Sequence, residues 1–276
     1  MNRTSEPRPI LVTGGTGKTG RRVAARLTAA GRPVRIGSRQ GQPPFDWHDP
    51  ATWGPALDGT AAAYLAYSPD IGFTGAADIV GDVARTAVTA GVRRLVLLSG
   101  RSEDGAQRAE RLVQSSGADW TIVRAAVFAQ NFTEGAFAGS IAEGILPMPV
   151  ADIAEPFIDV DDIADVATAA LLDDRHVGRL YEVTGPRLLT FTEALAILVP
   201  DCPVAYVHVA PAEMTAGLIA AGLPADEAAE LVTLFTTILD GRNTPIADGV
   251  QRALGRAPRD FSDYVRRTAA TGVWSR

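Results

Sequence analysis

A glycine-rich segment near the amino terminus combines residue types that bind phosphate. Gly14, Gly17 and Gly20 recur every three residues after the apolar stretch 10–12, and an amphipathic helical pattern follows. Glycines allow a tight turn, and the N–H groups and positive dipole end of the next helix attract a pyrophosphate. The segment therefore predicts a dinucleotide-binding turn made of Gly14, Gly15, Thr16, Gly17, Lys18, Thr19 and Gly20.

The glycine spacing fits two versions of the dinucleotide motif. Gly15, Gly17 and Gly20 match Gly-x-Gly-x-x-Gly, whereas Gly14, Gly17 and Gly20 match a wider variant. The segment also ends in Gly-Lys-Thr like a P-loop, but the position five residues before that Gly-Lys pair, where a P-loop needs glycine, is Val12. A dinucleotide fits and a P-loop does not. The remaining alternative is a tight strand-to-helix connection without a ligand.

The end of the second predicted strand favours NADP(H) over NAD(H). NAD-specific sites usually carry Asp or Glu there, whereas this chain has Ser38 and Arg39 after residues 33–37. A guanidinium and a hydroxyl suit a 2′-phosphate because both donate hydrogen bonds to its oxygens. Lys18 adds a second cation, and neither loop contains an acidic residue. We therefore expect NADP(H) as the cofactor, with an ordinary solvated arginine as the alternative for Arg39.

These segments belong to an alternating pattern of strands and helices. Near-continuous apolar strands between amphipathic helices indicate a parallel sheet covered on both faces, so the predicted fold class is α/β with a doubly wound Rossmann sheet. Ligands in such sheets bind at the carboxyl ends of the strands. Strands are predicted at 10–12, 33–37, 45–47, 61–66, 94–98 and 120–123, and helices near 50–57, 75–90 and 107–115.

The regular pattern weakens after about residue 133, where glycine and proline interrupt it. The predicted parts are a dinucleotide-binding domain, 1–134, completed by about 155–186, and a smaller, mainly helical substrate-side region, 135–154 and 187–276. Residues 180–184 are expected to return to the main sheet as a strand, and 203–209 to form an isolated strand. Asp161 and Asp162 fall in the first turn of a predicted helix, where the dipole favours them without any catalytic role.

Composition limits the partners and the chemistry. The 276 residues have a formal net charge of −6 and no basic stripe, which argues against nucleic acid as a partner. Cys202 is the only cysteine, which excludes an internal disulfide and is typical of a reducing cytosol. No apolar run approaches the ~20 residues that span a bilayer, so we expect a cytoplasmic protein that does not insert into membranes. His48, His176 and His208 lack ligand spacing, so no metal is expected.

Four stretches of the sequence are typical of one protein family. They are Thr-Gly-Gly-Thr-Gly-Lys-Thr-Gly at 13–20, Arg-Leu-Val-Leu-Leu-Ser at 94–99, Thr-Ile-Val-Arg at 121–124 continuing to Phe-Ala-Gln-Asn-Phe at 128–132, and Phe-Ile-Asp-Val-Asp-Asp-Ile at 157–163. Through them the chain resembles the NmrA-like branch of the atypical short-chain dehydrogenases/reductases. Residues 45–47, 185–191 and 255–261 make it similar, within that branch, to the agroclavine dehydrogenase/festuclavine synthase group.

The resemblance implies roles for residues beyond the glycine turn. The implied cofactor contacts are Ser38, Arg39, Tyr67, Ser99, Val127 and Phe128. The implied substrate pocket contains Tyr67, Phe128, Asn131 and Phe132. Structural roles compete with these: Phe128 and Phe132 are four residues apart and suit a core, Asn131 suits a turn or a helix cap, and Tyr67 suits an interface.

The usual proton-transfer pair of the superfamily is absent from this sequence. Ordinary members use Tyr-x-x-x-Lys, in which the lysine lowers the pKa of the tyrosine. Lys18 is the only lysine of the chain, and the corresponding helix offers Gln107, Glu110 and Arg111 instead. If the protein uses an acid, Tyr67 is the first candidate.

The predicted function is that of an NADPH-dependent reductase whose small-molecule substrate needs no strong acid. An iminium carbon accepts hydride directly, and conjugated acceptors need little help, so orientation supplies much of the catalysis. The alternatives are an NmrA-like redox sensor that binds dinucleotide without turnover and an NADPH:quinone oxidoreductase. A less favoured third alternative is an isomerase or cyclase that uses the cofactor structurally.

Overall fold

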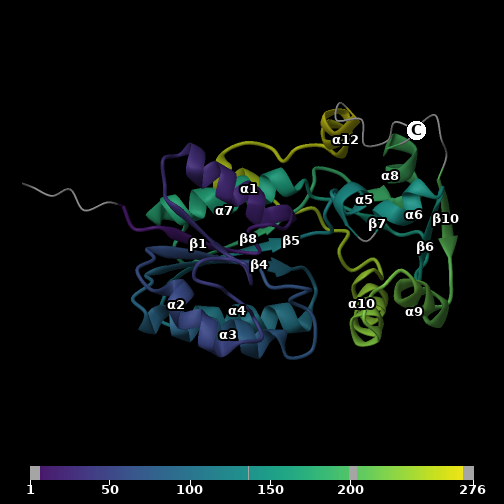
Figure 1. The fold of residues 1–276 in the computed structure, drawn as a ribbon. Coiled ribbons are helices and arrows are strands. Elements are labelled where there is room, and N and C mark those ends of the chain that lie inside the picture. The colour runs from purple at the N-terminus through teal and green to yellow at the C-terminus, as the bar shows by residue number, and fades with distance from the viewer. Residues whose placement is uncertain (1–6, 136, 199–203, 270–276) are drawn as a thin grey trace, which may run out of the picture. The chain divides into compact units, whose positions relative to one another are not determined.

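The main sheet of the computed structural model, which describes residues 7–135, 137–198 and 204–269, has six strands in the order β2-β1-β3-β4-β5-β8 (Figure 1). β1 pairs in parallel with β2 and β3, and β3 pairs in parallel with β4. The strand order reverses between β1 and β3, and this is the switch point at which doubly wound sheets bind ligands. The strands are β1 (Ile10–Thr13), β2 (Val34–Gly37), β3 (Ala62–Leu65), β4 (Arg94–Gly100), β5 (Asp119–Ala125) and β8 (Arg179–Val183).

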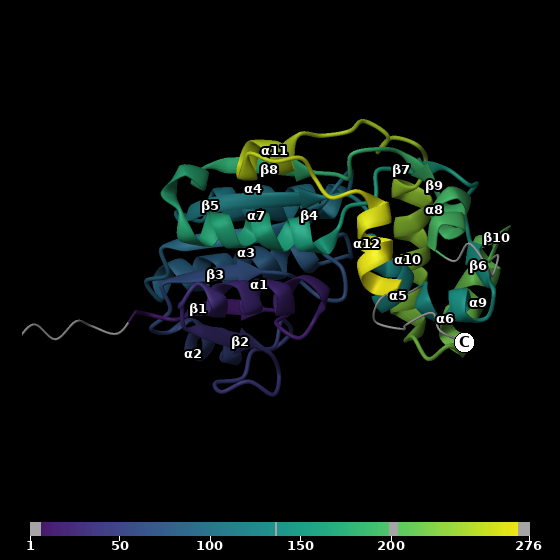
Figure 2. The same cartoon turned by 90° about the horizontal axis from the view of Figure 1, so that it is seen from above.

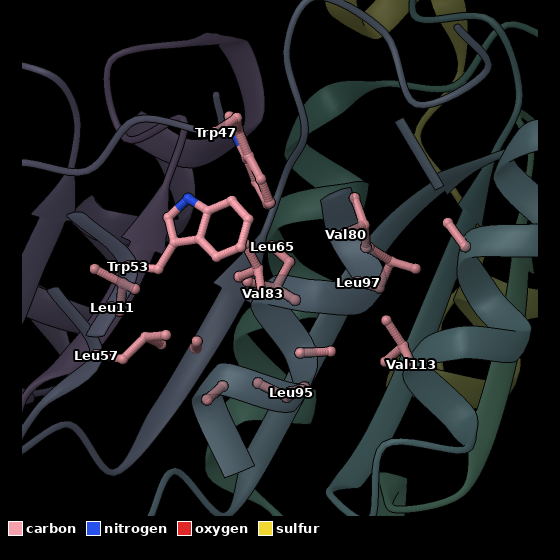
Figure 3. Packing of buried hydrophobic residues seen from close by; sticks show 14 of the residues in the cluster. Leu11, Trp47, Trp53, Leu57, Leu65, Val80, Val83, Leu95, Leu97 and Val113 are labelled. Carbon is pink, nitrogen blue, oxygen red and sulfur yellow. The ribbon is translucent and has the colours of Figure 1, made fainter. Parts of the chain in front are cut away.

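Helices cover both faces of this sheet, as the apolar strands require. Figures 1 and 2 show α1 (Lys18–Ala29) and α7 (Val160–Leu172) on one face, with α2 (Trp53–Leu57), α3 (Ala76–Thr89) and α4 (Asp104–Gln114) on the other. Two short 3-10 helices, Pro50–Thr52 and Asp174–His176, accompany them. Figure 3 shows the core under α3, where side chains from strands, helices and the loop before α2 interdigitate. The predicted α/β doubly wound fold is confirmed.

Residues 45–47 do not form the predicted strand. Phe45 and Trp47 alternate with Asp46 because both aromatic rings enter the core beneath α3 (Figure 3 labels Trp47), not because the backbone is pleated. The Asp46 N–H donates to the Thr52 hydroxyl over 3.0 Å, and the Trp53 indole N–H donates to the Asp46 carbonyl over 2.7 Å. Side chains of the following helical turns therefore satisfy a backbone that a sheet would otherwise satisfy.

The described residues divide into two compact units. Unit 1 holds the described parts of Met1–Gly100, Asp104–Arg124 and Ile163–Tyr181, and unit 2 those of Arg101–Glu103, Ala125–Asp162 and Glu182–Arg276. Residues 125–134, which the sequence led us to expect with the nucleotide-binding domain, thus pack in unit 2. No helix within the described ranges is both long and apolar enough to cross a membrane.

Unit 2 contains two small sheets and most of the C-terminal helices. β6 (Ile145–Met148) pairs in parallel with β10 (Ala205–His208), so the predicted isolated strand at 203–209 has a partner over its described part. β7 (Ala154–Glu155) pairs antiparallel with β9 (Leu189–Thr190). The helices are α5 (Asn131–Glu134), α6 (Ala138–Ala142), α8 (Phe191–Leu198), α9 (Pro211–Ala220), α10 (Ala225–Ile238), α11 (Gly249–Leu254) and α12 (Phe261–Ala269).

The acidic residues before and inside α7 have structural roles. The Asp159 carboxylate accepts a hydrogen bond from the Asp161 N–H over 2.9 Å and so caps the start of α7. Asp162 is completely buried and binds the Arg256 guanidinium over 2.6 Å and the backbone N–H of Arg259 over 2.6 Å. The helix dipole alone therefore does not explain Asp162, because its main task is to bind the segment before α12.

Candidate cofactor and active site

The turn between β1 and α1 brings the three glycines of the wider spacing together. Gly14 adopts a positive φ of 60°, and its carbonyl accepts the Gly17 N–H over 2.8 Å. A Cβ on Gly20 would lie 2.1 Å from the Gly14 carbonyl oxygen, so only glycine lets α1 approach this closely. The glycines of both candidate spacings lie in this one turn, since a Cβ on Gly20 would also lie 2.9 Å from the Gly15 Cα. Gly15 lies within the turn, where its Cβ would meet the Ile36 side chain at 2.8 Å.

The first turn of α1 suits an anion. Gly17 precedes the helix without a side-chain cap, and the first turn contains no acidic residue. The N–H groups and the positive dipole end of a helix that starts without a side-chain cap suit a ligand oxygen. Thr16 is exposed, Lys18 is half-buried and Thr19 is buried. The turn therefore presents one hydroxyl and one ammonium at the carboxyl end of β1.

An acidic residue faces Lys18 from the loop after β3, which the sequence did not predict. Burial raises the pKa of the Asp70 carboxyl, although the Gly72 N–H, which donates to it over 2.8 Å, and the Lys18 charge act in the opposite direction. Residues 14–20 and 38–40 contain no acidic residue, as the sequence showed, but Asp70 approaches Lys18 from a third loop. The charge of the only lysine is shared with Asp70.

Arg39 lies in the loop that follows β2, the strand paired with β1. Thr13 and Gly37, the last residues of β1 and β2, are paired in the sheet, so the glycine turn and the loop of Ser38 and Arg39 leave neighbouring strand ends. The Ser38 carbonyl accepts from the N–H groups of Gly41 and Phe45, each over 2.9 Å, which shapes the loop. Arg39 is exposed and forms no ion pair within the described part of the chain.

Tyr67 follows β3 and packs against aromatic neighbours. Its half-buried ring lies 5.1 Å from the Trp47 ring and 6.2 Å from the His48 ring. The Thr13 hydroxyl accepts the Ala66 N–H over 2.8 Å and donates to the Tyr64 carbonyl over 3.1 Å, which fixes the start of this loop to the end of β1. Tyr67 is thus held at the switch point between β1 and β3.

Ser99 belongs to a buried charged network and is not a free hydroxyl. Its Oγ donates to Glu110 Oε1 over 2.6 Å, and the Arg124 Nε donates to the same oxygen over 2.9 Å. Ser99 and Glu110 are 2% and 3% exposed, and an Arg124 Nη contacts the second oxygen of Glu110. Glu110, which the sequence placed on the helix of the usual catalytic pair, therefore neutralises Arg124 and fixes Ser99.

Residues 127–132, in unit 2, follow the carboxyl end of β5. The Val127 carbonyl accepts the Ile158 N–H, and the Ala129 N–H donates to the Ile158 carbonyl, each over 2.9 Å. The buried Gln130 amide donates to Asp159 Oδ1 and accepts the Val160 N–H, each over 2.8 Å. Gln130 thus fixes this segment to the start of α7.

The predicted pocket residues of this segment differ in exposure. Val127, Phe128 and Asn131 are half-buried, and Asn131 is the first residue of α5. Phe132 is only 1% exposed, and its ring packs against those of four other phenylalanines, Phe137, Phe157, Phe191 and Phe261. The placement of Phe132 in the substrate pocket is therefore wrong for this conformation, because phenylalanine rings occupy the space around its side chain.

Sequence reasoning missed Thr13, Asp70 and Gln130 as positioning residues. Thr13 and Gln130 stand inside motifs already singled out, and a glutamine between two phenylalanines in an apolar run was a usable signal. For Asp70, the only sequence signal was its position soon after a predicted strand.

Comparison with known proteins identifies the family of this chain. No family model matches the chain. It is 33% identical to the uncharacterized oxidoreductase YesF of Bacillus subtilis, over 97% of this chain and 98% of that protein. It is 31% identical to agroclavine dehydrogenase of Claviceps fusiformis, over 93% and 96%. The fold is similar to that of Citrobacter sp. triphenylmethane reductase complexed with NADP(H), with a TM-score of 0.74 and 19% identity over 94% of this chain and 99% of the other. The chain belongs to the NmrA-like branch of the atypical short-chain dehydrogenases/reductases.

Proposed function

We propose that the protein is an NADPH-dependent reductase that delivers hydride to an iminium or conjugated small molecule. The observation that carries this proposal is the glycine turn at the switch point, with Arg39 in the loop after the adjoining strand β2. The names of the two relatives, an oxidoreductase and a dehydrogenase, and the NADP(H) complex of the structural neighbour support it.

The residues of unit 1 fit this cofactor. A Cβ at Gly20 would collide with the turn, so the backbone there is adapted to close approach, and the first N–H groups of α1 suit the pyrophosphate. Arg39 and Ser38 would hold the 2′-phosphate through charge-assisted hydrogen bonds. Lys18, Tyr67 and Ser99 would border the rest of the cofactor. When bound, the reduced nicotinamide supplies the hydride.

Val127 and Phe128 would contact the nicotinamide, and Phe128 with Asn131 would contact the substrate. Their half-buried side chains follow the carboxyl end of β5, and Gln130 and the Ile158 backbone hold this segment in place. A fixed wall of this kind would orient the acceptor for hydride, which is a large part of the catalysis in a reaction without a strong acid.

The class of hydride acceptor follows from the hydrogen bond of Ser99 and from the position of Lys18. The Ser99 hydrogen is donated to Glu110, and the only lysine lies in the glycine turn, so no Ser-Tyr-Lys relay can protonate an ordinary ketone. Acceptors that draw hydride without strong acid catalysis remain, namely iminium ions, enones and quinones.

A turnover panel tests the proposal. NADPH consumption is followed with N-methyl-3,4-dihydroisoquinolinium, 2-cyclohexen-1-one and 1,4-naphthoquinone, with cyclohexanone as the unactivated control. Saturable consumption with at least one activated acceptor, and none with cyclohexanone, is the expected result. NADPH binding without consumption across the whole panel would refute the reductase and fit the dinucleotide sensor instead.

A further inference from the structure

Tyr64, in β3 of unit 1, is a buried tyrosine whose hydroxyl group has no hydrogen-bond partner. The residue is 0% exposed, and its hydroxyl oxygen forms no hydrogen bond with any residue that the structure describes. Buried polar groups are nearly always bonded, because an unbonded one costs the free energy of removing it from water. An exception inside the main sheet therefore calls for an explanation.

The side chain of Tyr64 points to the face of the sheet that α1 covers. Its strand neighbours Ala63 and Leu65 belong to the core beneath α3, and successive side chains of a strand point to opposite faces. Tyr64 is paired with Val12 of β1, and neither residue belongs to that core. Figures 1 and 2 show α1 and α7 on the other face. The Tyr64 ring therefore lies between the sheet and these helices.

The end of β3 also contacts the glycine turn directly. The Thr13 hydroxyl, at the end of β1, donates to the Tyr64 carbonyl over 3.1 Å. A Cβ on Gly14 would lie 3.4 Å from the carbonyl oxygen of Ala66, two residues after Tyr64. The Gly14 carbonyl is in turn the group against which Gly20, in the first turn of α1, packs. Tyr64 thus belongs to the segment on which the glycine turn and the start of α1 rest.

Thr19, the second residue of α1, is the polar side chain that faces Tyr64. It is 5% exposed and belongs to the buried face of the helix with Gly20, Val23 and Leu27. Burial raises the pKa of Tyr64, and the Thr19 hydroxyl is close enough to oppose that rise, although the two hydroxyl groups are not hydrogen-bonded in this conformation. The tyrosine hydroxyl therefore has an acceptor within reach, in the turn that we assign to the cofactor.

We propose that Tyr64 is a positioning residue for the cofactor, whose O–H donates a hydrogen bond to Thr19 Oγ1 when a dinucleotide pyrophosphate occupies the glycine turn. The inference rests on the proposed function, which assigns this turn to NADPH. Thr19 carries one of the N–H groups at the start of α1 that suit the pyrophosphate, so a bond to its side chain fixes that N–H group as well. Because the hydrogen bond forms only in the occupied state, its free energy adds to the affinity for the cofactor.

The test compares cofactor affinity with stability. Tyr64→Phe should raise the dissociation constant for NADPH about fivefold in a fluorescence titration, the usual effect of one lost hydrogen bond. The constant for NADH should rise by the same factor, because both cofactors contain the pyrophosphate. The melting temperature of the cofactor-free variant, measured by calorimetry, should equal or exceed that of the wild type, since the lost hydroxyl had no partner.

Further variants separate this hydrogen bond from a general effect on the core. Thr19→Val keeps the shape of the side chain without its hydroxyl and should weaken NADPH binding by a similar factor. Combining it with Tyr64→Phe should add little further loss. Thr19→Ser keeps the hydroxyl and should bind like the wild type. The matched control is Tyr181→Phe in β8, at the edge of the sheet, which removes a buried hydroxyl 2.8 Å from His176 Nδ1. It should lower the melting temperature and leave the NADPH affinity unchanged.

Three results would overturn the inference. They are unchanged NADPH affinity of Tyr64→Phe, losses that add fully in the double variant, and a lower melting temperature of cofactor-free Tyr64→Phe, which would mean that the hydroxyl is already bonded. If Tyr64→Phe does not fold, the difference between Thr19→Val and Thr19→Ser decides. A wild type that binds NADPH without consuming it refutes the reductase alone, whereas one that binds neither dinucleotide refutes both proposals.

Discussion

Two buried glutamates, one in each unit, show how differently a protein interior treats the same side chain. Glu110 in unit 1 receives a hydroxyl from Ser99 and a guanidinium from Arg124. Glu155 in unit 2 receives neither from any described residue. A paired buried carboxylate is part of the architecture, whereas an unpaired one costs stability and suggests a ligand. The partners of a buried charge are thus more informative than its burial.

The largest expected effect comes from removing the partner of the paired glutamate. Arg124→Ala leaves Glu110, whose side chain is 4% exposed, without its cation and should lower the free energy of unfolding by about 3–5 kcal/mol. Urea denaturation measures the loss. The double variant Arg124→Met/Glu110→Met should recover most of it, because no charge is then buried. If the double variant is as unstable as the single one, lost packing and not the uncompensated charge explains the effect.

The unpaired glutamate should instead make stability depend on pH. The pKa of Glu155 is about 7 in the folded protein against an ordinary 4.5, so the folded chain binds more protons between these values. The stability contribution of the protonated group is complete below the lower value and is lost as pH rises through the upper one. The unfolding free energy of Glu155→Gln minus that of the wild type should therefore rise by up to about 3 kcal/mol between about pH 5 and pH 8.

Measuring that difference at each pH cancels the contributions of other titrating groups. Glu213→Gln, at an exposed position of α9, is the control variant for the same measurement. A flat difference for Glu155→Gln would show that the folded protein does not hold Glu155 in its protonated form, and the contrast with Glu110 would disappear.

Arg39 extends the comparison to an unpaired charge at the surface, where water solvates it until a phosphate binds. The dissociation constant for NADH should be at least ten times that for NADPH. Arg39→Ala should make the two constants equal, which removes about 1.4 kcal/mol of binding preference for NADPH. Isothermal titration calorimetry gives both constants. Arg93→Ala, with a 79% exposed side chain before β4, is the matched control and should retain the ratio. Equal affinities in the wild type would contradict the 2′-phosphate assignment.

Asp70 is intermediate between the paired Glu110 and the unpaired Glu155, since one backbone N–H donates to it and it shares the charge of Lys18. Asp70→Asn removes the competition for Lys18 and should tighten NADPH binding by about 0.5 kcal/mol, or roughly twofold, at low salt. The gain should shrink as salt is added. A weaker NADPH affinity would mean that Asp70 orients Lys18 more than it competes for it.

Features that depend on residues close together in the chain were predictable from the sequence. The glycine turn, the β1–α1 unit and Arg39 after β2 follow from local spacing, and the structure has each of them where the sequence suggested. Residues 45–47 show the limit of this reasoning, because alternation reports which side chains are buried and not whether the backbone is paired. The parallel partner of β10 lies about 60 residues earlier in the chain, so no local pattern could reveal it.

The roles of side chains that contact distant parts of the chain could not be predicted from the sequence. Phe132 looked equally suited to a pocket and to a core, and only its four ring neighbours decide the matter. Asp162 looked like a dipole partner, but its arginines come from more than ninety residues further along the chain. Glu155 has no motif at all. A sequence does not show which buried carboxyl group lacks a hydrogen-bond partner, because the partners come from distant parts of the chain.

The position of Lys18 has a practical consequence. Because the chain has no other lysine, its ε-ammonium is the single side-chain target for an amine-acylating reagent. That target lies at the first residue of α1, inside the glycine turn that we assign to the cofactor. Acylation of this one peptide, followed by mass spectrometry, therefore gives a footprint of dinucleotide occupancy that needs neither a mutation nor a substrate.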